Sequence, residues 1–542
     1  MSLMMYRGKR FWFVALCFCL LIPLLNNSAH AATQPKIGIY LDGKKIETDV
    51  PPYIIPKLNV TMVPLSVISK NLGANVNWSQ SDKTVTIRHE GRLLSMTIGQ
   101  NYALVGGQRV DLETSVQAIG GRTMVPLRFV SNQLNLLVTW YQSSQTIMLQ
   151  SQGGSEENPQ ENPRENPQNP GSSTDGSLRG AWVSTVYNLD WPSDKSYGKS
   201  EQQKQDYIQM LDDLQGMGMN AVFVQVRPSA DSFYPSALVP WSKYLQGKQG
   251  AEPDYDPLAF MIEETHKRGM EFHAWFNPFR ATVDAKTDGL APNHVAITHP
   301  DWIVKSGSKT YINPGIPEAR QHIIDTIMEV VNGYAIDGVH LDDYFYPSDG
   351  VFADDATYMA NNSNGIGNKA DWRRDNINQF VKSLGESIHR AKPFVRFGIS
   401  PFGVWRNQSV DPTGSDTKAG VTTYDNMYAD VRTWIKQEWI DYVAPQIYWS
   451  LSFKVAQYDK LVDWWANEVR GTNVELLVGH APYKLGTKEA GWNAAQEIID
   501  QLNYNRNVPE VKGDIFFSAK DLRKNPLGLV PLLQSYYQTA RP

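Results

Sequence analysis

Cysteine is nearly absent from this sequence of 542 residues. The two cysteines, Cys17 and Cys19, both lie in an apolar run from Phe11 to Leu25 near the N-terminus. Basic residues precede the run and Ala-His-Ala at 29–31 follows it, which is typical of a secretory signal peptide. We expect residues 1–31 to be removed and the mature chain to be secreted, extracellular or attached to the cell wall, with neither a disulfide nor thiol chemistry. An uncleaved membrane anchor is the alternative, although the run is short for a membrane span.

Metal-ligand and nucleophile motifs are also missing. The ten histidines form no HExxH or HxxxH spacing and none has a cysteine partner, so we expect neither a metal nor any other cofactor. The absence of a GxSxG elbow argues against a serine esterase. The net charge is −5, and there is no long basic run, which makes nucleic acid a poor candidate partner.

One segment occurs twice between residues 33 and 150. The motif Thr-Met-Val-Pro-Leu at 61–65 recurs at 123–127, and Trp78 recurs as Trp140, both at a spacing of 62 residues. A turn-bearing strand pair precedes each motif, and a short helix and a second strand pair are expected after it. The region predicts a small duplicated β-rich (α+β) N-terminal domain.

This duplicated region resembles the N-terminal stalk domain of copper amine oxidases, on the strength of its repeated MVPL and tryptophan pattern. The name implies no metal, because the region holds a single histidine, His89, and no cysteine. We interpret the region as a spacer or a wall-binding element. Residues 151–177 then form an Asn-Pro repeat without apolar side chains other than proline, which predicts a semi-rigid linker and a domain boundary.

Strand-like and helix-like patterns alternate from residue 178 to residue 542. Eight such units predict an α/β fold, a (β/α)8 TIM barrel. An open nucleotide-binding sheet is disfavoured, because no glycine-rich turn follows the first strand. The predicted strands are 179–185, 221–227, 271–277, 338–344, 396–402, 442–449, 475–481 and 513–519. The predicted helices include 256–268, 317–334, 374–391, 427–439, 457–470 and 494–506.

Polar residues gather at the C-terminal ends of these strands, where barrel enzymes carry their sites. The strongest signal is DGVHLDDYFYP at 337–347, in which Asp342 and Asp343 directly follow an apolar strand. Strand alternation places His340, Asp342 and Tyr344 on one face, with Asp342 at the barrel mouth and Asp343 at its rim. Glycoside hydrolysis needs one protonated and one ionised carboxyl group, and closely packed acids have separated pKa values. We predict both acids to be catalytic, with their individual roles open and with Asp190, Asp231 and Asp425 as alternative second acids.

The other predicted site residues bind substrate. Arginine suits bidentate recognition of a carboxylate, so Arg227 and Asn277 are candidates for sugar hydroxyls or a lactyl carboxylate, although Arg227 could equally form a structural ion pair. Exposed aromatic faces suit sugar stacking, and the stacking candidates are Trp191, Trp241, Trp405 and Trp449. The predicted substrate-binding set is Arg227, Gln225, Asn277, His340, Gln446, Tyr448, Trp449 and His480.

Two resemblances place the principal acid at Asp342. The segment at 337–347 resembles the chitinase-type strand signature and the strand that carries the amylase-type nucleophile, and both register their aspartate on Asp342. His340 and Tyr344 depart from the chitinase pattern, so that mechanism does not transfer in full. QIYW at 446–449 resembles the chitinase strand whose tyrosine holds an acetamido group, which leaves substrate-assisted cleavage of an N-acetylated glycan open.

Most of residues 178–542 resembles the bacterial family 10-like glycosyl hydrolases. Six motifs carry the resemblance, in order along the chain: RGAWVST at 179–185, QVRPSADSFYPS at 225–236, AWFNPFR at 274–280, DGVHLDDYFYP at 337–347, ISPFGVWRN at 399–407 and APQIYW at 444–449. The resemblance implies a secreted enzyme that hydrolyses O-glycosidic bonds of a bacterial polysaccharide, with peptidoglycan strands as the candidate. A catalytically silent glycan-binding barrel is the alternative, but binding alone would need neither aspartate.

Overall fold

The computed structural model describes residues 37–41, 44–46, 48–55, 60–65, 75–89, 92–134, 136–141, 146–151, 177–343, 345–348 and 350–539. The chain divides after Leu134 into two compact units. The predicted signal peptide lies outside the described residues, as do Tyr344 and nearly all of the predicted linker. None of the helices in these described ranges is long and apolar enough to cross a membrane.

The two copies of the Met-Val-Pro-Leu motif lie on neighbouring strands of one sheet. Strands β4 (Val60–Pro64) and β11 (Arg122–Pro126) pair antiparallel with Val63 opposite Val125. Because the register is symmetric about this valine pair, a local two-fold axis relates the two copies. β3 (Tyr53–Ile55) and β10 (Gln117–Ile119) complete the sheet in the order β10-β11-β4-β3. The predicted duplication therefore builds one shared, buried core from both copies.

Antiparallel strands make up the remainder of the N-terminal region. A meander of five strands follows the first motif copy, and its β8–β9 hairpin turns at Gly106 and Gly107, both with positive φ. The helix α2 (Leu127–Gln133) follows the second copy, as predicted. The strands are β1 (Gly38–Leu41), β2 (Lys44–Ile46), β5 (Asn75–Ser79), β6 (Thr84–His89), β7 (Arg92–Thr97), β8 (Tyr102–Val105), β9 (Gln108–Asp111), β12 (Leu136–Tyr141) and β13 (Thr146–Ser151).

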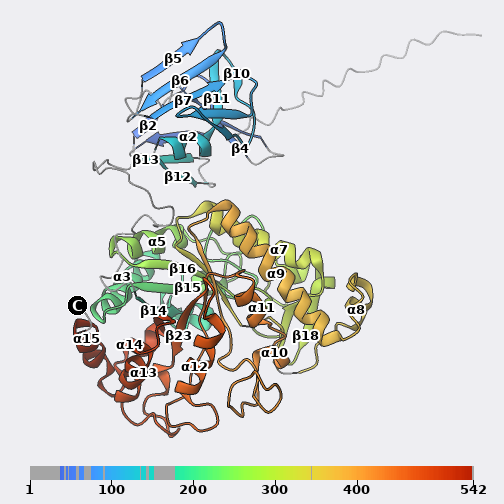
Figure 1. Cartoon of the computed structure of the whole chain (residues 1–542), viewed down its shortest axis with the longest axis vertical. Coiled ribbons are helices and arrows are strands. Elements are labelled where there is room, and N and C mark those ends of the chain that lie inside the picture. Colours follow the sequence, from blue (N-terminus) through green and yellow to red (C-terminus); the bar gives the residue numbers. More distant parts are fainter. Residues whose placement is uncertain are drawn as a thin grey trace, which may run out of the picture. The chain divides into compact units, whose positions relative to one another are not determined.

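Eight parallel strands close into a barrel in the second unit, which confirms the predicted (β/α)8 fold (Figure 1). The barrel order follows the chain, and β24 closes the ring on β14 by pairing Asp514 with Arg179. Each predicted strand range overlaps a barrel strand, although β14 begins one residue and β24 two residues earlier than predicted. The strands are β14 (Leu178–Val183), β15 (Ala221–Arg227), β16 (Glu271–Phe276), β20 (Gly338–Asp342), β21 (Arg396–Ser400), β22 (Tyr442–Val443), β23 (Glu475–His480) and β24 (Val511–Phe516).

Helices surround the barrel, and local signals in the sequence set their starts (Figure 1). Helix α5 begins after Asp256, whose carboxylate accepts a hydrogen bond from the Ala259 amide at 3.0 Å, with Pro257 in the first turn. All six predicted ranges contain a helix. The α-helices are α3 (Ser200–Gly216), α4 (Lys243–Gln246), α5 (Pro257–Lys267), α6 (Val295–Thr298), α7 (Pro317–Gly333), α8 (Asp355–Asn361), α9 (Lys369–Ala391), α10 (Thr423–Asn426), α11 (Val431–Lys436), α12 (Tyr458–Val469), α13 (Gln496–Arg506), α14 (Ala519–Arg523) and α15 (Leu529–Thr539).

Two features of the barrel differ from the sequence prediction. The sixth strand ends at Val443 instead of Trp449, because Pro445 has no amide hydrogen and its carbonyl accepts from both Ile447 and Gly479 at 3.0 Å. A small antiparallel sheet that was not predicted follows the third strand, in the order β17-β19-β18. Its strands are β17 (Arg280–Thr282), β18 (Ile303–Ser306) and β19 (Lys309–Ile312).

A hydrogen-bonded relay crosses the barrel interior. The Trp182 indole donates to His340 Nε2 at 3.0 Å, so the His340 proton lies on Nδ1, which contacts the Tyr442 hydroxyl at 3.1 Å. Tyr442 in turn contacts His273 Nδ1 at 3.2 Å, and His273 Nε2 lies 3.0 Å from Glu271. Taken from Trp182 through His340, Tyr442 and His273 to Glu271, each group donates one hydrogen bond to the next. Burial lowers the pKa of His340 well below its ordinary value. The centre of the barrel is therefore polar, neutral at His340 and internally satisfied.

We predict that Gly398→Ala destabilises the barrel by about 2 kcal/mol, the usual scale of overpacking a core. A Cβ atom at Gly398 would lie 2.1 Å from the Tyr442 ring, which two histidines hold in place. The measurement is urea unfolding, with Gly420→Ala as the control, because a Cβ there meets nothing within 4 Å. Equal unfolding midpoints for the two variants would show that the Tyr442 ring can move aside.

Candidate active site

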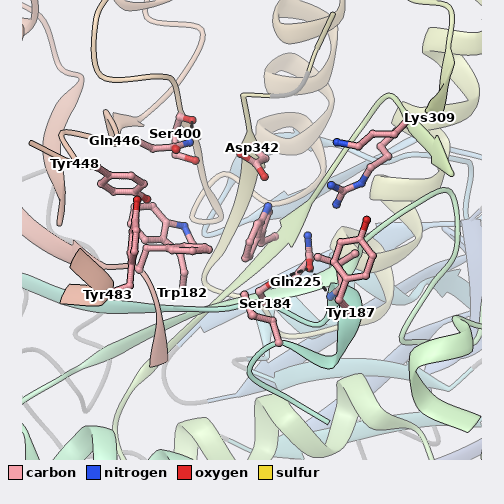
Figure 2. Close-up of a pocket in the computed structure, with 15 residues that line it drawn as sticks. Trp182, Ser184, Tyr187, Gln225, Lys309, Asp342, Ser400, Gln446, Tyr448 and Tyr483 are labelled. Atoms are coloured by element: carbon pink, nitrogen blue, oxygen red, sulfur yellow. Dashed lines mark hydrogen bonds between the residues drawn. The ribbon is translucent and has the colours of Figure 1, made fainter. Parts of the chain in front are cut away.

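A cavity of about 450 Å³ opens at the C-terminal ends of the barrel strands. Figure 2 shows Asp342 at its centre, between Tyr448 and Tyr483 on one side and Tyr187 and Lys309 on the other. The residues that line the cavity come from strand ends and the loops that follow them. They are Trp182, Ser184, Val186, Tyr187, Leu189, Gln225, Trp275, Arg280, Lys309, Asp342, Ser400, Gln446, Tyr448, Tyr483 and Phe517.

Asp342 is the last residue of β20 and its carboxylate is held by two donors. The Asn277 side-chain amide donates to Oδ2 at 2.8 Å, and the Asp343 backbone amide donates to Oδ1 at 2.8 Å. The two hydrogen bonds fix the side-chain orientation of Asp342. The arrangement therefore presents an oriented carboxyl group to the cavity.

The orientation of Asn277 is set by Gln225 on the neighbouring strand. The Gln225 side-chain oxygen accepts from the backbone amides of Thr185 at 3.0 Å and Val186 at 2.9 Å. Its amide nitrogen must therefore face the Asn277 oxygen, to which it donates. Asn277 is then left with its own NH2 group directed at Asp342. Three consecutive barrel strands thus contribute to one directional hydrogen-bond chain.

Asp343 is more deeply buried than its neighbour, with 3% of its surface exposed against 7% for Asp342. Burial, and then the charge of Asp342, raise the pKa of Asp343 well above its ordinary value, while a hydrogen bond from Gln446 opposes the shift. We therefore infer that Asp343 holds a proton at neutral pH. The sequence predicted Asp343 at the rim of the barrel mouth. The structure shows its side chain buried, and its carbonyl accepts a hydrogen bond from Phe345 N at 2.9 Å.

Four of the predicted site residues line the cavity, and a fifth supports one of them from a buried position. Gln225, Asp342, Gln446 and Tyr448 line the cavity, and Asn277 contacts Asp342 from a buried position. Gln446 also donates to the Ser400 carbonyl at 3.1 Å, which fixes its side chain next to Asp343. His340 lies beneath the cavity in the barrel relay, where Trp182, which lines the cavity, is its donor.

Arg227 is fully buried behind the wall and does not line the cavity. Its Nη1 donates to the carbonyls of Asn277 at 2.8 Å and Pro278 at 3.0 Å, so the guanidinium holds the loop after β16. Asp231 lies near Arg227 and Arg280, and burial raises the pKa of Asp231 to about 6. Arg227, Asp231 and Arg280 therefore support the wall of the site. Direct sugar binding by Arg227 stays a prediction.

Trp449 and His480 are not brought to the cavity. His480 is buried on the helix side of β23, where its ring nitrogens contact Gln501 at 2.9 Å and Asp514 at 2.8 Å. Trp449 packs edge-on against Phe402, with ring centroids 5.6 Å apart. Neither residue therefore supports substrate contact in this geometry.

The alternative acids and stacking tryptophans serve other contacts. Asp190 accepts from Ser184 N, Ser518 Oγ and Lys520 N, which joins the loops after β14 and β24. Asp425 pairs with Arg406 at 2.8 Å. Trp191 and Trp405 are buried in packing, and neither they nor Trp241 line the cavity. Within the described ranges no group of three or more His, Cys, Asp or Glu side chains is arranged to hold a metal ion.

Sequence reasoning missed most of the aromatic and cationic lining. Trp275 is in phase with His273 and Asn277 on the third predicted strand, so strand alternation contained a signal for it. No polar residue was selected on the first predicted strand, which carries Trp182. Tyr187, Tyr483 and Lys309 lie in loops or in the inserted sheet, and no periodic pattern marks them. Arg280 ends the AWFNPFR motif, but nothing in the motif shows that it reaches the cavity.

The fold and the acid pair at the barrel mouth define a barrel hydrolase, and similarity searches give its class. Residues 177–511 match the glycosyl hydrolase-like 10 family, and residues 40–149 match the copper amine oxidase N-terminal domain. Glycosyl hydrolase YngK of Bacillus subtilis is 54% identical over 66% of this chain and 71% of its own length. Glycosyl hydrolase DigH of Escherichia coli is 43% identical over 64% of this chain and 84% of its own length.

A solved structure, the PgaB (BpsB) glycoside hydrolase domain from Bordetella bronchiseptica, aligns with 67% of this chain and 99% of that domain. The sequence identity is 12% and the TM-score is 0.47. From the sequence matches, the chain belongs to the glycosyl hydrolase-like 10 family and is an enzyme of the glycosidase class. Its substrate is a carbohydrate, and its N-terminal region is a copper amine oxidase N-terminal-like domain.

We predict that Asp343→Asn stabilises the protein at alkaline pH. A carboxyl group whose pKa is raised by folding binds its proton more tightly in the folded state, so stability falls as pH rises through the window above the unfolded value of about 4. The amide removes that dependence. At pH 8 the variant should be more stable than the wild type by more than about 1 kcal/mol, and the difference should shrink towards pH 4.

The measurement is urea unfolding at both pH values, with Asp301→Asn as the control because Asp301 is exposed on a surface turn. The control should change stability little at either pH. A variant that is less stable than the wild type at pH 8, or equally shifted at both pH values, would contradict a buried protonated Asp343.

Proposed function

We propose that this enzyme hydrolyses O-glycosidic bonds of a bacterial polysaccharide and that its substrate is the glycan strand of peptidoglycan. The observation that carries the proposal is the acid pair: the Asp342 carboxyl group lines the cavity, and Asp343, whose pKa is raised by burial, lies beside it. Glycoside hydrolysis needs one ionised and one protonated carboxyl group, the first to stabilise positive charge at the anomeric carbon and the second to protonate the leaving oxygen. The aromatic lining supports the proposal, since sugar rings stack on such faces.

The roles of the two acids follow from their surroundings. Asp342 is the group that meets the anomeric carbon, either as nucleophile or by orienting a substrate acetamido group. Asp343 stores the proton for the leaving group, and Gln446, which contacts Asp343 and lines the cavity, keeps that carboxyl group oriented. The cavity-lining Tyr448 is placed to hold a sugar substituent opposite Asp342.

The test of these roles is the pair of amide variants. Asp342→Asn should lower turnover by at least about two orders of magnitude on every active substrate, because it removes the charge that the transition state needs. Asp343→Asn should lose comparable turnover on glycan but recover part of it on an aryl glycoside with a good leaving group, which needs little protonation.

Asp425→Asn is the matched control, since that aspartate pairs with Arg406 and does not line the cavity. Its turnover should stay within about twofold of the wild type. New reducing ends from peptidoglycan and from peptide-free glycan strands are the readout. Near wild-type turnover of both Asp342→Asn and Asp343→Asn would remove these acids from the mechanism.

The N-terminal domain supports a location at the cell wall. We propose that the chain is exported by its N-terminal segment and that the duplicated domain acts as a spacer or wall-binding element. The barrel does not depend on that domain to close, because β14 pairs with β24 and β15 of the barrel itself.

Deletion of residues 32–176 should therefore leave turnover on a soluble oligosaccharide within about twofold of the full chain. The shortened chain keeps Ser177, whose carbonyl accepts from the Asn220 side chain at 2.9 Å. Binding to intact cell walls, measured by co-sedimentation, should weaken. An insoluble or inactive barrel would show that the two parts share a core.

A further inference from the structure

The cavity is chemically different on its two sides. Trp182, Tyr448 and Tyr483 lie on one side of Asp342, and Lys309 and Tyr187 lie on the other (Figure 2). The first side offers flat apolar faces. The second side has cationic groups, because Lys309 lies there and Arg280, on the paired strand β17, also lines the cavity. A chain of sugars that crosses Asp342 would therefore meet two unlike environments.

Among the described residues, no carboxylate forms an ion pair with Lys309. The side chain extends from β19 of the inserted sheet into the cavity and is half-buried. Asp342 is the acid that shares this cavity, and it is occupied by donors from Asn277 and Asp343. An anion bound in the cavity would therefore meet an ammonium group that no described carboxylate pairs with.

The charge behind the same wall is also positive. Arg227 and Arg280 lie near one carboxylate, that of Asp231, and burial raises the pKa of Asp231 towards neutrality. The neighbouring His294 is neutral, because burial lowers its pKa to about 4. Arg280 donates its Nε to the Pro228 carbonyl at 2.8 Å, which fixes the guanidinium in place. Among the described residues, Lys309, Arg227 and Arg280 therefore make this side of the cavity cationic.

We propose that Lys309 and Arg280 form a subsite for the carboxylate of an acidic sugar, while the aromatic side takes a neutral sugar. The assignment rests on the proposed function, and it adds that the scissile bond joins an acidic unit to a neutral one. A singly charged carboxylate suits the Lys309 ammonium together with the Arg280 guanidinium, whose Nε already donates to the Pro228 carbonyl. The carboxylate can belong to a lactyl ether, as in muramic acid, or to a uronic acid.

The test compares each acidic oligosaccharide with the same compound after its carboxyl groups have been reduced to alcohols. Alternating oligosaccharides with lactyl ethers form one arm and oligosaccharides with uronic acids form the other. Lys309→Gln is the test variant. Lys305→Gln is the matched control, because Lys305 lies on the adjacent strand β18, is exposed and does not line the cavity.

We expect the wild type to bind the acidic form of one arm at least about tenfold more tightly than its reduced form, and Lys309→Gln to lose that preference. Binding of the reduced form should change less than about threefold, and the control should behave as the wild type. In steady state the loss should appear mainly in KM and should diminish at high salt. The arm that shows the preference identifies the acidic sugar.

Binding is measured by calorimetry in the Asp343→Asn background, so that it does not depend on turnover and leaves the cavity-lining Asp342 intact. Equal affinity of the wild-type cavity for acidic and reduced forms in both arms would overturn the subsite, as would equal weakening of both forms by Lys309→Gln. A Lys309-dependent preference without any glycan cleavage by the active enzyme would support the subsite and refute the proposed function.

Discussion

The hydrogen-bond chain from Gln225 through Asn277 to Asp342 is the interaction on which the site depends. Each link has a fixed direction, because backbone amides of the first loop occupy the Gln225 oxygen and leave only its NH2 group for Asn277. The carboxylate at the end of the chain therefore receives a donor without any reorientation during the reaction. This arrangement exists only if strands β14, β15, β16 and β20 are neighbours in register, as the closed barrel makes them.

A second constraint acts on the adjacent acid. Asp343 is buried beside a charge of the same sign, and its Oδ1 has no hydrogen-bond partner among the described residues. Burying an ionised carboxyl group there would cost more than keeping its proton, so the site stores an acid at the expense of stability. The polar barrel interior beneath is different, because the relay from Trp182 to Glu271 leaves each donor satisfied.

Periodicity in the sequence was sufficient to predict the barrel, since a strand buried on both faces is an unbroken apolar run and its helices carry clear start signals such as Asp256-Pro257. Periodicity could not predict that β22 would end at Val443. The Pro445 carbonyl accepts a hydrogen bond from Gly479 of β23, and that partner is known only from the folded chain. The inserted sheet was missed for a related reason: its three short strands have too few residues for a period to show.

The site was predicted in part, and strand phase explains the division. Gln225 shares the inward face of β15 with Phe223 and reaches the cavity. His480 shares the outward face of β23 with Leu476 and Val478 and faces the helices instead. Polarity at a strand end was therefore a weaker guide than phase. Lys309, Tyr187 and Tyr483 reach the cavity from loops and an insertion, and only the folded chain brings them to Asp342.

The central claim is that the two adjacent acids share one proton and that it lies on Asp343 at neutral pH. Infrared difference spectroscopy tests this claim most directly, because a protonated carboxyl group has a C=O stretching band that a carboxylate lacks. The spectrum of the wild type minus that of Asp343→Asn at pH 7 should contain this band, and the band should survive in Asp342→Asn. A wild-type spectrum without the band, or a band lost in Asp342→Asn and kept in Asp343→Asn, would contradict the account.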